Sequence, residues 1–166
     1  MNNVPESDEE DKLEKVKNAK LLKTYRDKYG PVGFVQVPKS LINGAARDML
    51  GLTQTDIAVC LDIRRRQSNS HFADTVTVRM VDTAKSTGYA RSTIWKTKER
   101  LVELQLASAT STVVDHKYQP IKWCLYPLWI ALSEATGESF LSMFGKKELD
   151  LYDEWLAETD YVSSVA

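Results

Sequence analysis

The stretch VDTAKSTGYARSTIWKTKERLVELQLA, residues 81–107, decides the fold that this sequence predicts. Gly88 lies in its first half, and glycine readily adopts the positive φ that a tight turn between two helices commonly needs. Ala84, four residues earlier, is small enough to let a second helix cross closely. We therefore predict a short helix before Gly88 and a second helix that starts near residues 90–92.

The second helix is predicted to have an apolar back and a polar outer face. Ile94 and Leu101 are one heptad apart and share a face, with Thr97 between them and Leu104 continuing it. The outer face of the first turns is left to Arg91, Ser92, Trp95 and Lys96. A helix that reads a DNA groove needs this arrangement, because its back is fixed to the body while its N-terminal outer residues reach base edges.

The outer residues have the chemistry of DNA contacts. Arg91 and Lys96 can donate hydrogen bonds to guanine edges or to phosphates, and Ser92 can bond either. The N-terminus of the helix itself favours a phosphate. Trp95 could stack on the sugars of the DNA backbone, although packing beneath a following hairpin suits so large an apolar group better.

A β-hairpin is predicted directly after this helix. Residues 108–114 are rich in threonine and valine, residues 115–120 are a polar connection, and residues 121–126 return as a second strand. Lys117 lies near the predicted tip, where it could touch backbone phosphate or the minor groove.

Ala84, residues 88–94 and residues 101–106 together resemble the reader motif of winged helix-turn-helix transcriptional regulators. The resemblance implies a three-helix head, a β-hairpin wing and binding of double-stranded DNA through helix 90–104. The positions that depart from the motif are Lys98, where a second leucine is usual, Gln105, which replaces an exit glycine, and Ala107, which replaces a branched residue.

The order of elements is also similar to the DNA-binding heads of phage and plasmid replication initiators. A Phe-Val-Gln-Val-Pro-Lys entry at 34–39 is followed by a helix that Thr53 caps, a polar loop over 64–73 and a strand over 75–78. Three functions therefore stay open: a transcriptional regulator, an initiator that binds origin DNA, and a winged-helix module that binds protein without DNA.

Further helices are predicted on both sides of the head. Residues 1–11 are acidic and predicted to be disordered, and residues 12–29 form an imperfect amphipathic helix rich in lysine. Residues 34–37 form a short strand or an extended lead-in, and residues 39–49 a helix that Gly51 stops. After Pro127 the tail is predicted to be helical in three pieces, separated by glycines, whose many apolar residues cover the head or pair with another copy.

Charge is distributed unevenly along the chain. Residues 34–126 carry 13 basic and 8 acidic side chains, whereas residues 127–166 carry 2 and 8. This balance favours a polyanion-binding face in the middle of the chain. The predicted organisation is an acidic tail (1–11), a helix and linker (12–33), a winged helix-turn-helix domain (34–126) and an acidic helical extension (127–166).

The sequence argues against several other classes of protein. It has no apolar run long enough for a membrane span and no secretory signal, so we expect a cytoplasmic protein without a membrane partner. Cys60 and Cys124 are expected to be buried, reduced thiols. His71 and His116 lie far apart without a metal-ligand cluster, so no metal, no cofactor and no enzyme activity are predicted.

The predicted class is mainly α with a small β-hairpin wing. We predict a homodimer that pairs through residues 12–29 or 127–160, because DNA half-sites usually face paired heads. Arg64, Arg65, Arg66 and Lys85 are candidate phosphate contacts, although the three arginines could instead interact with the helix dipole. The predicted DNA-binding residues are Ala90, Arg91, Ser92, Thr93, Trp95, Lys96, Arg100 and Lys117.

Overall fold

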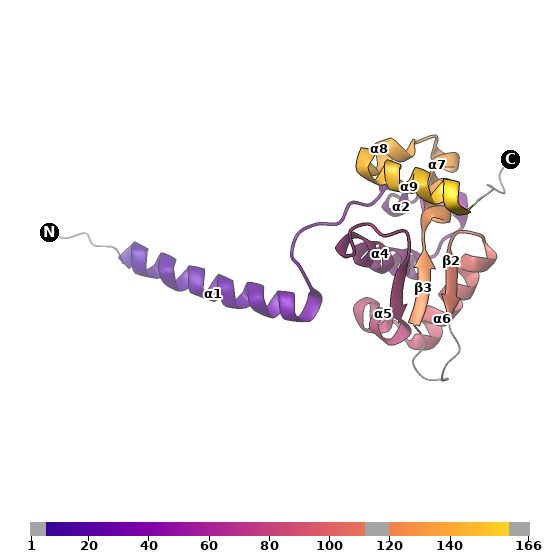
Figure 1. The fold of residues 1–166 in the computed structure, drawn as a ribbon. Coiled ribbons are helices and arrows are strands. Elements are labelled where there is room, and N and C mark those ends of the chain that lie inside the picture. The colour runs from indigo at the N-terminus through magenta and orange to yellow at the C-terminus, as the bar shows by residue number, and fades with distance from the viewer. Residues whose placement is uncertain (1–5, 112–119, 160–166) are drawn as a thin grey trace. The chain divides into compact units, whose positions relative to one another are not determined.

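The computed structural model describes residues 6–111 and 120–159, and it divides the chain into the units Met1–Phe34 and Val35–Ala166. The first unit is helix α1, Glu6–Tyr29, which runs on to an irregular linker (Figure 1). Every side chain of α1 from Asp8 onward is exposed. The predicted disorder of residues 1–11 is therefore wrong for residues 6–11, which form the first turns of the helix, and residues 1–5 lie outside the described part.

Three helices of the second unit form a compact head. Helices α4 (Gln54–Asn69), α5 (Met80–Thr87) and α6 (Arg91–Glu103) pack against one another. Thr53 caps α4 as predicted: its hydroxyl accepts from the Asp56 amide, and the Asp56 carboxylate accepts from the Thr53 amide. The polar loop predicted over 64–73 is wrong for residues 64–69, because α4 continues to Asn69 and buries part of its polar side chains, whereas residues 70–73 are a turn as expected.

A three-stranded antiparallel sheet completes the head. Its strands are β1 (Val76–Arg79), β2 (Ser108–Ser111) and β3 (Pro120–Cys124), in the order β1-β3-β2. Strands β2 and β3 pair from Ser108 opposite Cys124 to Ser111 opposite Ile121, which is the predicted hairpin. The connection over 112–119, with Lys117 and His116, lies outside the described residues. Residues 34–37 are an extended lead-in and not a strand.

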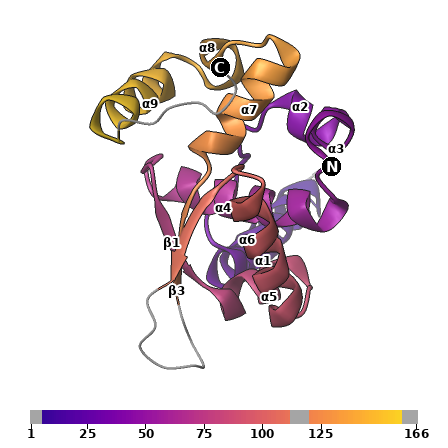
Figure 2. The ribbon, with the colours of Figure 1, turned by 90° about the vertical axis from the view of Figure 1, so that its right-hand side faces the viewer.

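Helices α5 and α6 joined by a tight turn, followed by this hairpin, make the head a winged helix-turn-helix fold. The expected class, mainly α with a small β-hairpin wing, is confirmed. Figure 2 shows the strands beside α4, α5 and α6, with the remaining helices of the unit gathered at the end of the sheet opposite α5.

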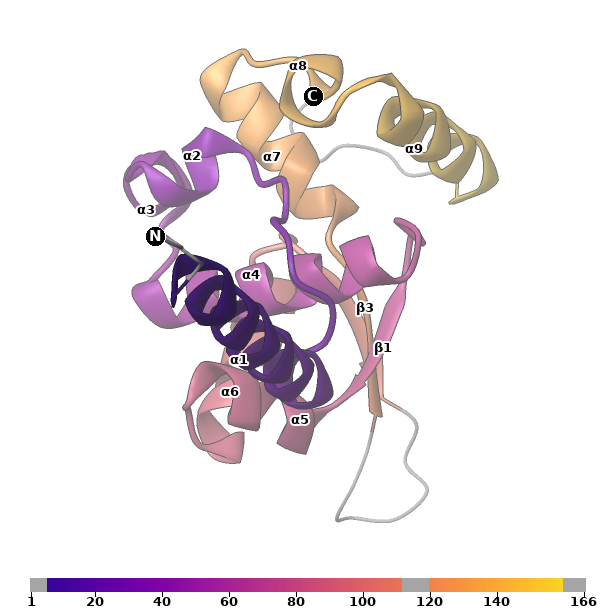
Figure 3. The ribbon, with the colours of Figure 1, turned by 90° about the vertical axis from the view of Figure 1, so that its left-hand side faces the viewer.

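A second layer of helices covers that end of the head. It consists of α2 (Lys39–Ile42), α3 (Ala45–Leu50), α7 (Tyr126–Thr136), α8 (Phe140–Phe144) and α9 (Lys146–Thr159). Helices α2 and α3 pack against α7, as Figure 3 shows. The single helix predicted over 39–49 is interrupted, because Gly44 has a φ of 97° and the Asn43 side chain accepts from the next helix's first amide.

The tail after Pro127 belongs to the same core as the head. Leu128, Trp129 and Leu132 of α7 are completely buried, and Trp129 packs edge-on against Phe144 with ring centroids 5.1 Å apart. Trp123 and Tyr126 are also core residues. The predicted boundary after residue 126 does not separate two compact units. No helix within 6–111 or 120–159 combines the length and apolarity that crossing a membrane requires.

The two cysteines are buried, unpaired thiols, which confirms the prediction. Burial raises the pKa of Cys60 to about 12 and that of Cys124 to about 11. Both side chains therefore stay protonated at neutral pH and serve as small apolar groups.

One fully buried ion pair joins the head to the second layer. The Arg64 guanidinium on α4 donates to both Glu148 carboxylate oxygens on α9, at 2.8 and 2.6 Å, and to the carbonyl of Gln36 at 2.8 Å. Gln67 accepts a further bond at 3.0 Å. The rings of Phe72 and Phe144 flank the guanidinium, with its central carbon 5.3 and 4.6 Å from their centroids. Arg64 is inaccessible to solvent, so its predicted role as a phosphate contact is wrong.

Replacing Glu148 with alanine is expected to lower the free energy of unfolding by about 3–5 kcal/mol, because it leaves the Arg64 charge buried without its partner. The double variant Arg64→Met, Glu148→Leu is expected to recover most of that loss, since well-packed apolar groups commonly replace a buried pair at little cost. Urea denaturation measures both. A Glu148→Ala variant within about 0.5 kcal/mol of the wild type would contradict burial of the pair.

Helix α6 ends in a Schellman motif that is built on a non-glycine residue. The Leu106 amide donates to the Leu101 carbonyl at 2.9 Å, and the Gln105 amide donates to the Val102 carbonyl at 3.0 Å. Gln105 has a φ of 58°, in the left-handed region where L residues are disfavoured. The position at which the motif expects glycine therefore keeps the glycine conformation although its residue is glutamine.

We expect Gln105→Gly to raise the free energy of unfolding by about 0.5–1 kcal/mol, because relief of the left-handed strain exceeds the added chain entropy of the unfolded state. Gln105→Val is expected to lower it by more than about 1 kcal/mol, since a β-branched residue tolerates positive φ least. Thermal unfolding of the three proteins ranks them. A Gln105→Val variant more stable than the Gln105→Gly variant would contradict the left-handed backbone conformation at residue 105.

Candidate nucleic-acid interface

The turn between α5 and α6 sets the direction of the candidate reader helix. Gly88 ends α5 with a φ of 78°, and its amide donates to the Ala84 carbonyl at 2.9 Å. Only Tyr89 and Ala90 separate it from the first residue of α6. The positive φ at Gly88 lets the chain reverse within these few residues, as the sequence predicted.

The apolar face of α6 is buried in the core. Ile94 and Leu101 are completely inaccessible to solvent, and Thr97 between them is buried as well. Leu104 does not continue this face: it is the C-cap of the helix and 45% exposed. The helix ends one residue before Leu104, so the heptad spacing no longer places this side chain on the buried face.

The first turns of α6 present their polar side chains to solvent. Arg91, Ser92 and Lys96 are exposed, as is the N-cap residue Ala90, while Thr93 and Trp95 are half-buried. Neither Arg91 nor Lys96 forms an ion pair or a side-chain hydrogen bond with another residue of the described ranges. These cations are therefore available to a partner outside the chain.

Arg91 differs in this respect from the other arginines of the second unit. Each of them has a carboxylate within ion-pair distance, whereas Arg91 has none among residues 35–111 and 120–159. The arginines that form these pairs are Arg47, Arg64, Arg65, Arg66, Arg79 and Arg100. No described carboxylate holds the guanidinium of Arg91, and a guanidinium can form paired hydrogen bonds to a guanine edge or a phosphate.

Trp95 lies next to a cation that sequence reasoning did not include. The ammonium nitrogen of Lys98 is 4.2 Å from the centroid of the Trp95 ring, one turn along α6. The half-buried Trp95 is thus partly covered by Lys98. Lys98, which stands where the motif usually has leucine, is a half-buried addition to the positive charge of this helix.

Arg100 is exposed but has partners on a neighbouring segment. Its guanidinium lies 3.0 Å from the Asp56 carboxylate and donates to the Gly51 carbonyl at 2.5 Å. The same Asp56 carboxylate completes the capping box of α4. Arg100 thus links α6 to the start of α4, and a DNA contact by this residue would compete with that link.

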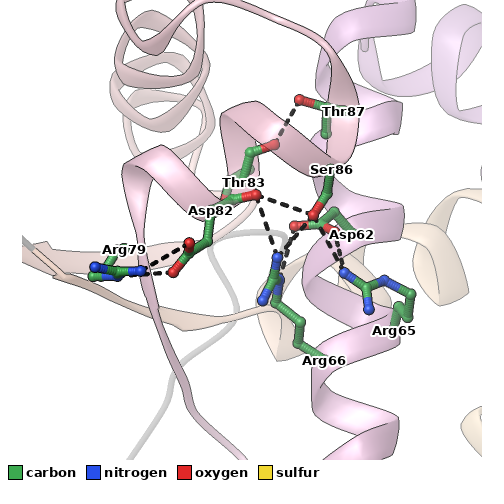
Figure 4. Close-up of polar contacts among 8 residues, drawn as sticks. All are labelled: Asp62, Arg65, Arg66, Arg79, Asp82, Thr83, Ser86 and Thr87. Carbon is green, nitrogen blue, oxygen red and sulfur yellow. Dashed lines mark hydrogen bonds and ion pairs between the residues drawn. The ribbon is translucent and has the colours of Figure 1, made fainter. Parts of the chain in front are cut away.

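Arg65 and Arg66 bridge α4 and α5, as Figure 4 shows. Both donate to the buried Asp62 carboxylate, at 2.8 and 3.0 Å, and both reach the Ser86 hydroxyl, at 3.4 and 2.9 Å. Asp62 is only 4% exposed, so two guanidiniums offset one carboxylate that is shielded from water. The arrangement positions α5 on α4 and leaves these arginines at a partly exposed edge, where a phosphate could also be bound.

Arg79 and Lys122 are exposed cations on the sheet that the sequence did not single out. Thr77 faces Lys122 across the β1–β3 pair, and Arg79, two residues along β1, lies on the same face. Arg79 donates to the Asp82 carboxylate at 2.9 and 3.1 Å, and this hydrogen bonding holds the pKa of Asp82 below its ordinary value. Lys85, one turn after Asp82, is exposed on α5.

The site has the composition of a polyanion interface rather than of a metal centre. No group of histidine, cysteine and carboxylate side chains suited to a metal ion occurs within residues 6–111 and 120–159. The exposed side chains in the first turns of α6, Arg91, Ser92 and Lys96, offer cationic and hydroxyl donors, which can hydrogen-bond base edges and phosphates.

Comparison with known proteins gives little sequence similarity. No protein-family model matches the chain, and no curated protein matches it. Among solved structures, it is similar to the adhesin competence repressor AdcR from Streptococcus pyogenes, at 19% identity over 74% of this chain and 91% of that chain, with a TM-score of 0.33. It is also similar to NadR in complex with 4-hydroxyphenylacetate, at 14% identity over 77% of this chain and 87% of that chain, with a TM-score of 0.35.

Proposed function

We propose that this chain binds double-stranded DNA by placing α6 in the major groove and that it acts as a transcriptional regulator. The observation that supports this most directly is the exposed guanidinium of Arg91, for which the described chain provides no carboxylate. It lies at the start of a helix whose back is fixed by Ile94 and Leu101. A base-reading side chain needs both features, because it must be free to bond and rigidly placed.

Two further exposed residues in the first turns of α6 suit the same role. Lys96 lies five residues after Arg91, about 140° further around the helix, so the two cations lie at the two edges of its outer side. Ser92 adds a hydroxyl that can donate to a base or to a phosphate oxygen. The N-terminal end of α6 adds unpaired backbone amides, which favour a phosphate group.

Arg91→Ala and Lys96→Ala are each expected to weaken binding to the preferred duplex by roughly tenfold to a hundredfold, the cost of about 1–3 kcal/mol for a lost base contact. The duplex is obtained by selecting bound sequences from a random pool with the wild-type chain. Gel shifts at several salt concentrations then measure the affinity of each variant.

Arg47→Ala is the matched control, because this exposed arginine is paired with Asp48 on α3 and lies outside the proposed face. Arg91→Lys separates the two kinds of contact: it keeps the charge for a phosphate but cannot make the two-pronged bond to guanine. Wild-type affinity in both alanine variants would remove α6 as the reader. Transcription from a reporter that carries the selected site tests the regulator, since an initiator would instead support replication from it.

The predicted homodimer is part of the proposal. The apolar residues of the tail, such as Trp129, Leu132 and Phe140, are buried in their own chain, and Leu141 is the large apolar side chain of the described tail that stays exposed. Residues 12–29 therefore carry more apolar surface for pairing than residues 127–160. Light scattering on the full chain is expected to give twice the mass of 18.8 kDa, and a monomer at micromolar concentration would contradict pairing.

A further inference from the structure

Helix α1 divides into two halves of opposite charge. Residues 6–14 carry six acidic side chains and one basic one, a balance of −5, whereas residues 15–29 carry six basic side chains and one acidic one, a balance of +5. The described side chains of both halves are exposed throughout. The second half thus presents a dense positive charge that its own helix does not cover.

The helix dipole accounts for only part of this pattern. Cations stabilise a helix within its last turn, which explains Arg26 and Lys28. Lys15, Lys17, Lys20 and Lys23 lie further from the C-terminus, where the dipole contributes little. Asp27 is the one carboxylate among residues 15–29. Asp11, Glu14 and Asp27 lie three or four residues from Lys15, Lys17 and Lys23, whereas Lys20 has no carboxylate at that spacing. None of these lysines forms an ion pair within the described residues, so their charge remains available to a partner.

Four of the six basic side chains of this half, Lys15, Lys20, Lys23 and Arg26, lie within about 140° of the helix circumference, whereas Lys17 and Lys28 lie beside Leu21. Lys12 and Lys23 are separated by about three helical turns, and so are Lys15 and Arg26, so each pair projects in nearly the same direction. The opposite side carries Leu21, Leu22, Tyr25 and Tyr29. Tyr25 and Tyr29 contact each other, with ring centroids 5.2 Å apart. The second half thus has a cationic face, on which Asp27 is the one carboxylate, opposite a small apolar strip.

We propose that this cationic face, centred on Lys20, Lys23 and Arg26, binds the phosphate backbone of the DNA that α6 reads. The inference rests on the proposed function, since it adds a second contact to the same duplex. Double-stranded DNA carries one negative charge per roughly 1.7 Å of its axis, and residues 15–29 span about 22 Å of helix. The six cations of this half are therefore opposite in charge to the roughly 13 phosphates that a duplex carries along the same length.

An irregular linker joins α1 to the second unit. Residues 30–38 separate α1 from α2, and nine residues span up to about 30 Å when extended. Gly30 and Gly33, which have φ values of 90° and 131°, lie in this linker and permit changes of direction. A duplex bound by the head raises the concentration of phosphate near α1, which favours DNA over other polyanions.

The test compares two variants that remove the same charge from different places. The α1 variant removes three cations and keeps good helix formers: Lys20→Gln, Lys23→Gln and Arg26→Gln. The control variant removes three exposed lysines from the second unit: Lys39→Gln, Lys146→Gln and Lys147→Gln. Binding of the full chain to a short duplex of mixed sequence is measured against salt concentration. We expect the α1 variant to reduce the slope of log affinity against log salt by about 0.9 for each lost phosphate contact, and the control to keep the wild-type slope.

Several outcomes would overturn the inference, and they differ from failure of the proposed function. A wild-type slope in the α1 variant, together with weakened binding in Arg91→Ala, would leave the reader helix in place and remove the α1 contact. If anionic phospholipid vesicles bind the wild type but not the α1 variant while the DNA slope stays unchanged, the face binds a membrane surface. If the α1 variant instead only changes the mass in light scattering, the face pairs with the acidic half of a second copy.

Discussion

A single buried guanidinium fixes the geometry of the second unit. Arg64 belongs to α4, which carries α5 and α6, and its partner Glu148 belongs to α9, more than 80 residues later. Its third partner, the carbonyl of Gln36, belongs to the chain that enters the unit. An ion pair without solvent is stable only where geometry and hydrogen bonds are complete, so these segments have one mutual arrangement that satisfies it. The head is thereby attached rigidly to the helices behind it.

The rigidity of the head continues through Asp56 and Asp62 to α5 and α6. Asp56 caps α4 and holds Arg100 of α6, and Asp62 holds Arg65 and Arg66, which reach Ser86 of α5. Each of these carboxylates serves two partners from a position almost closed to water. Low exposure strengthens such bonds, because water competes with them less. The exposed N-terminus of α6 is therefore presented by a body in which polar bonds, and not only apolar packing, determine the helix angles.

The parts of the fold that could be predicted are those that a local or periodic pattern in the sequence marks. The heptad spacing of Ile94 and Leu101 and the glycine at 88 were sufficient to predict α5, the turn and α6, because each reports a local requirement of the backbone. Residues 64–69 were misassigned because polarity usually marks a loop, and nothing local shows that Arg64 meets a carboxylate on α9. The partners of Arg65, Arg66 and Arg100 are likewise brought together by the tertiary structure, so the local sequence does not show them. The prediction that Leu104 continues the buried face of α6 is wrong for a different reason: the helix ends at Glu103, and Leu104 is its C-cap residue.

Charge counting alone would have overstated the size of the candidate interface. The balance of 13 basic and 8 acidic residues over 34–126 includes arginines whose carboxylate partners lie within the fold. A guanidinium that already satisfies a carboxylate gains less from a phosphate, since it must give up one partner for the other. Within the described residues, the exposed Arg91 and Lys96 of α6 have no carboxylate within ion-pair distance, and neither have the half-buried Lys98 or the exposed Lys85 and Lys122. The structure thus separates the paired arginines from the cations that remain available for the proposed contact.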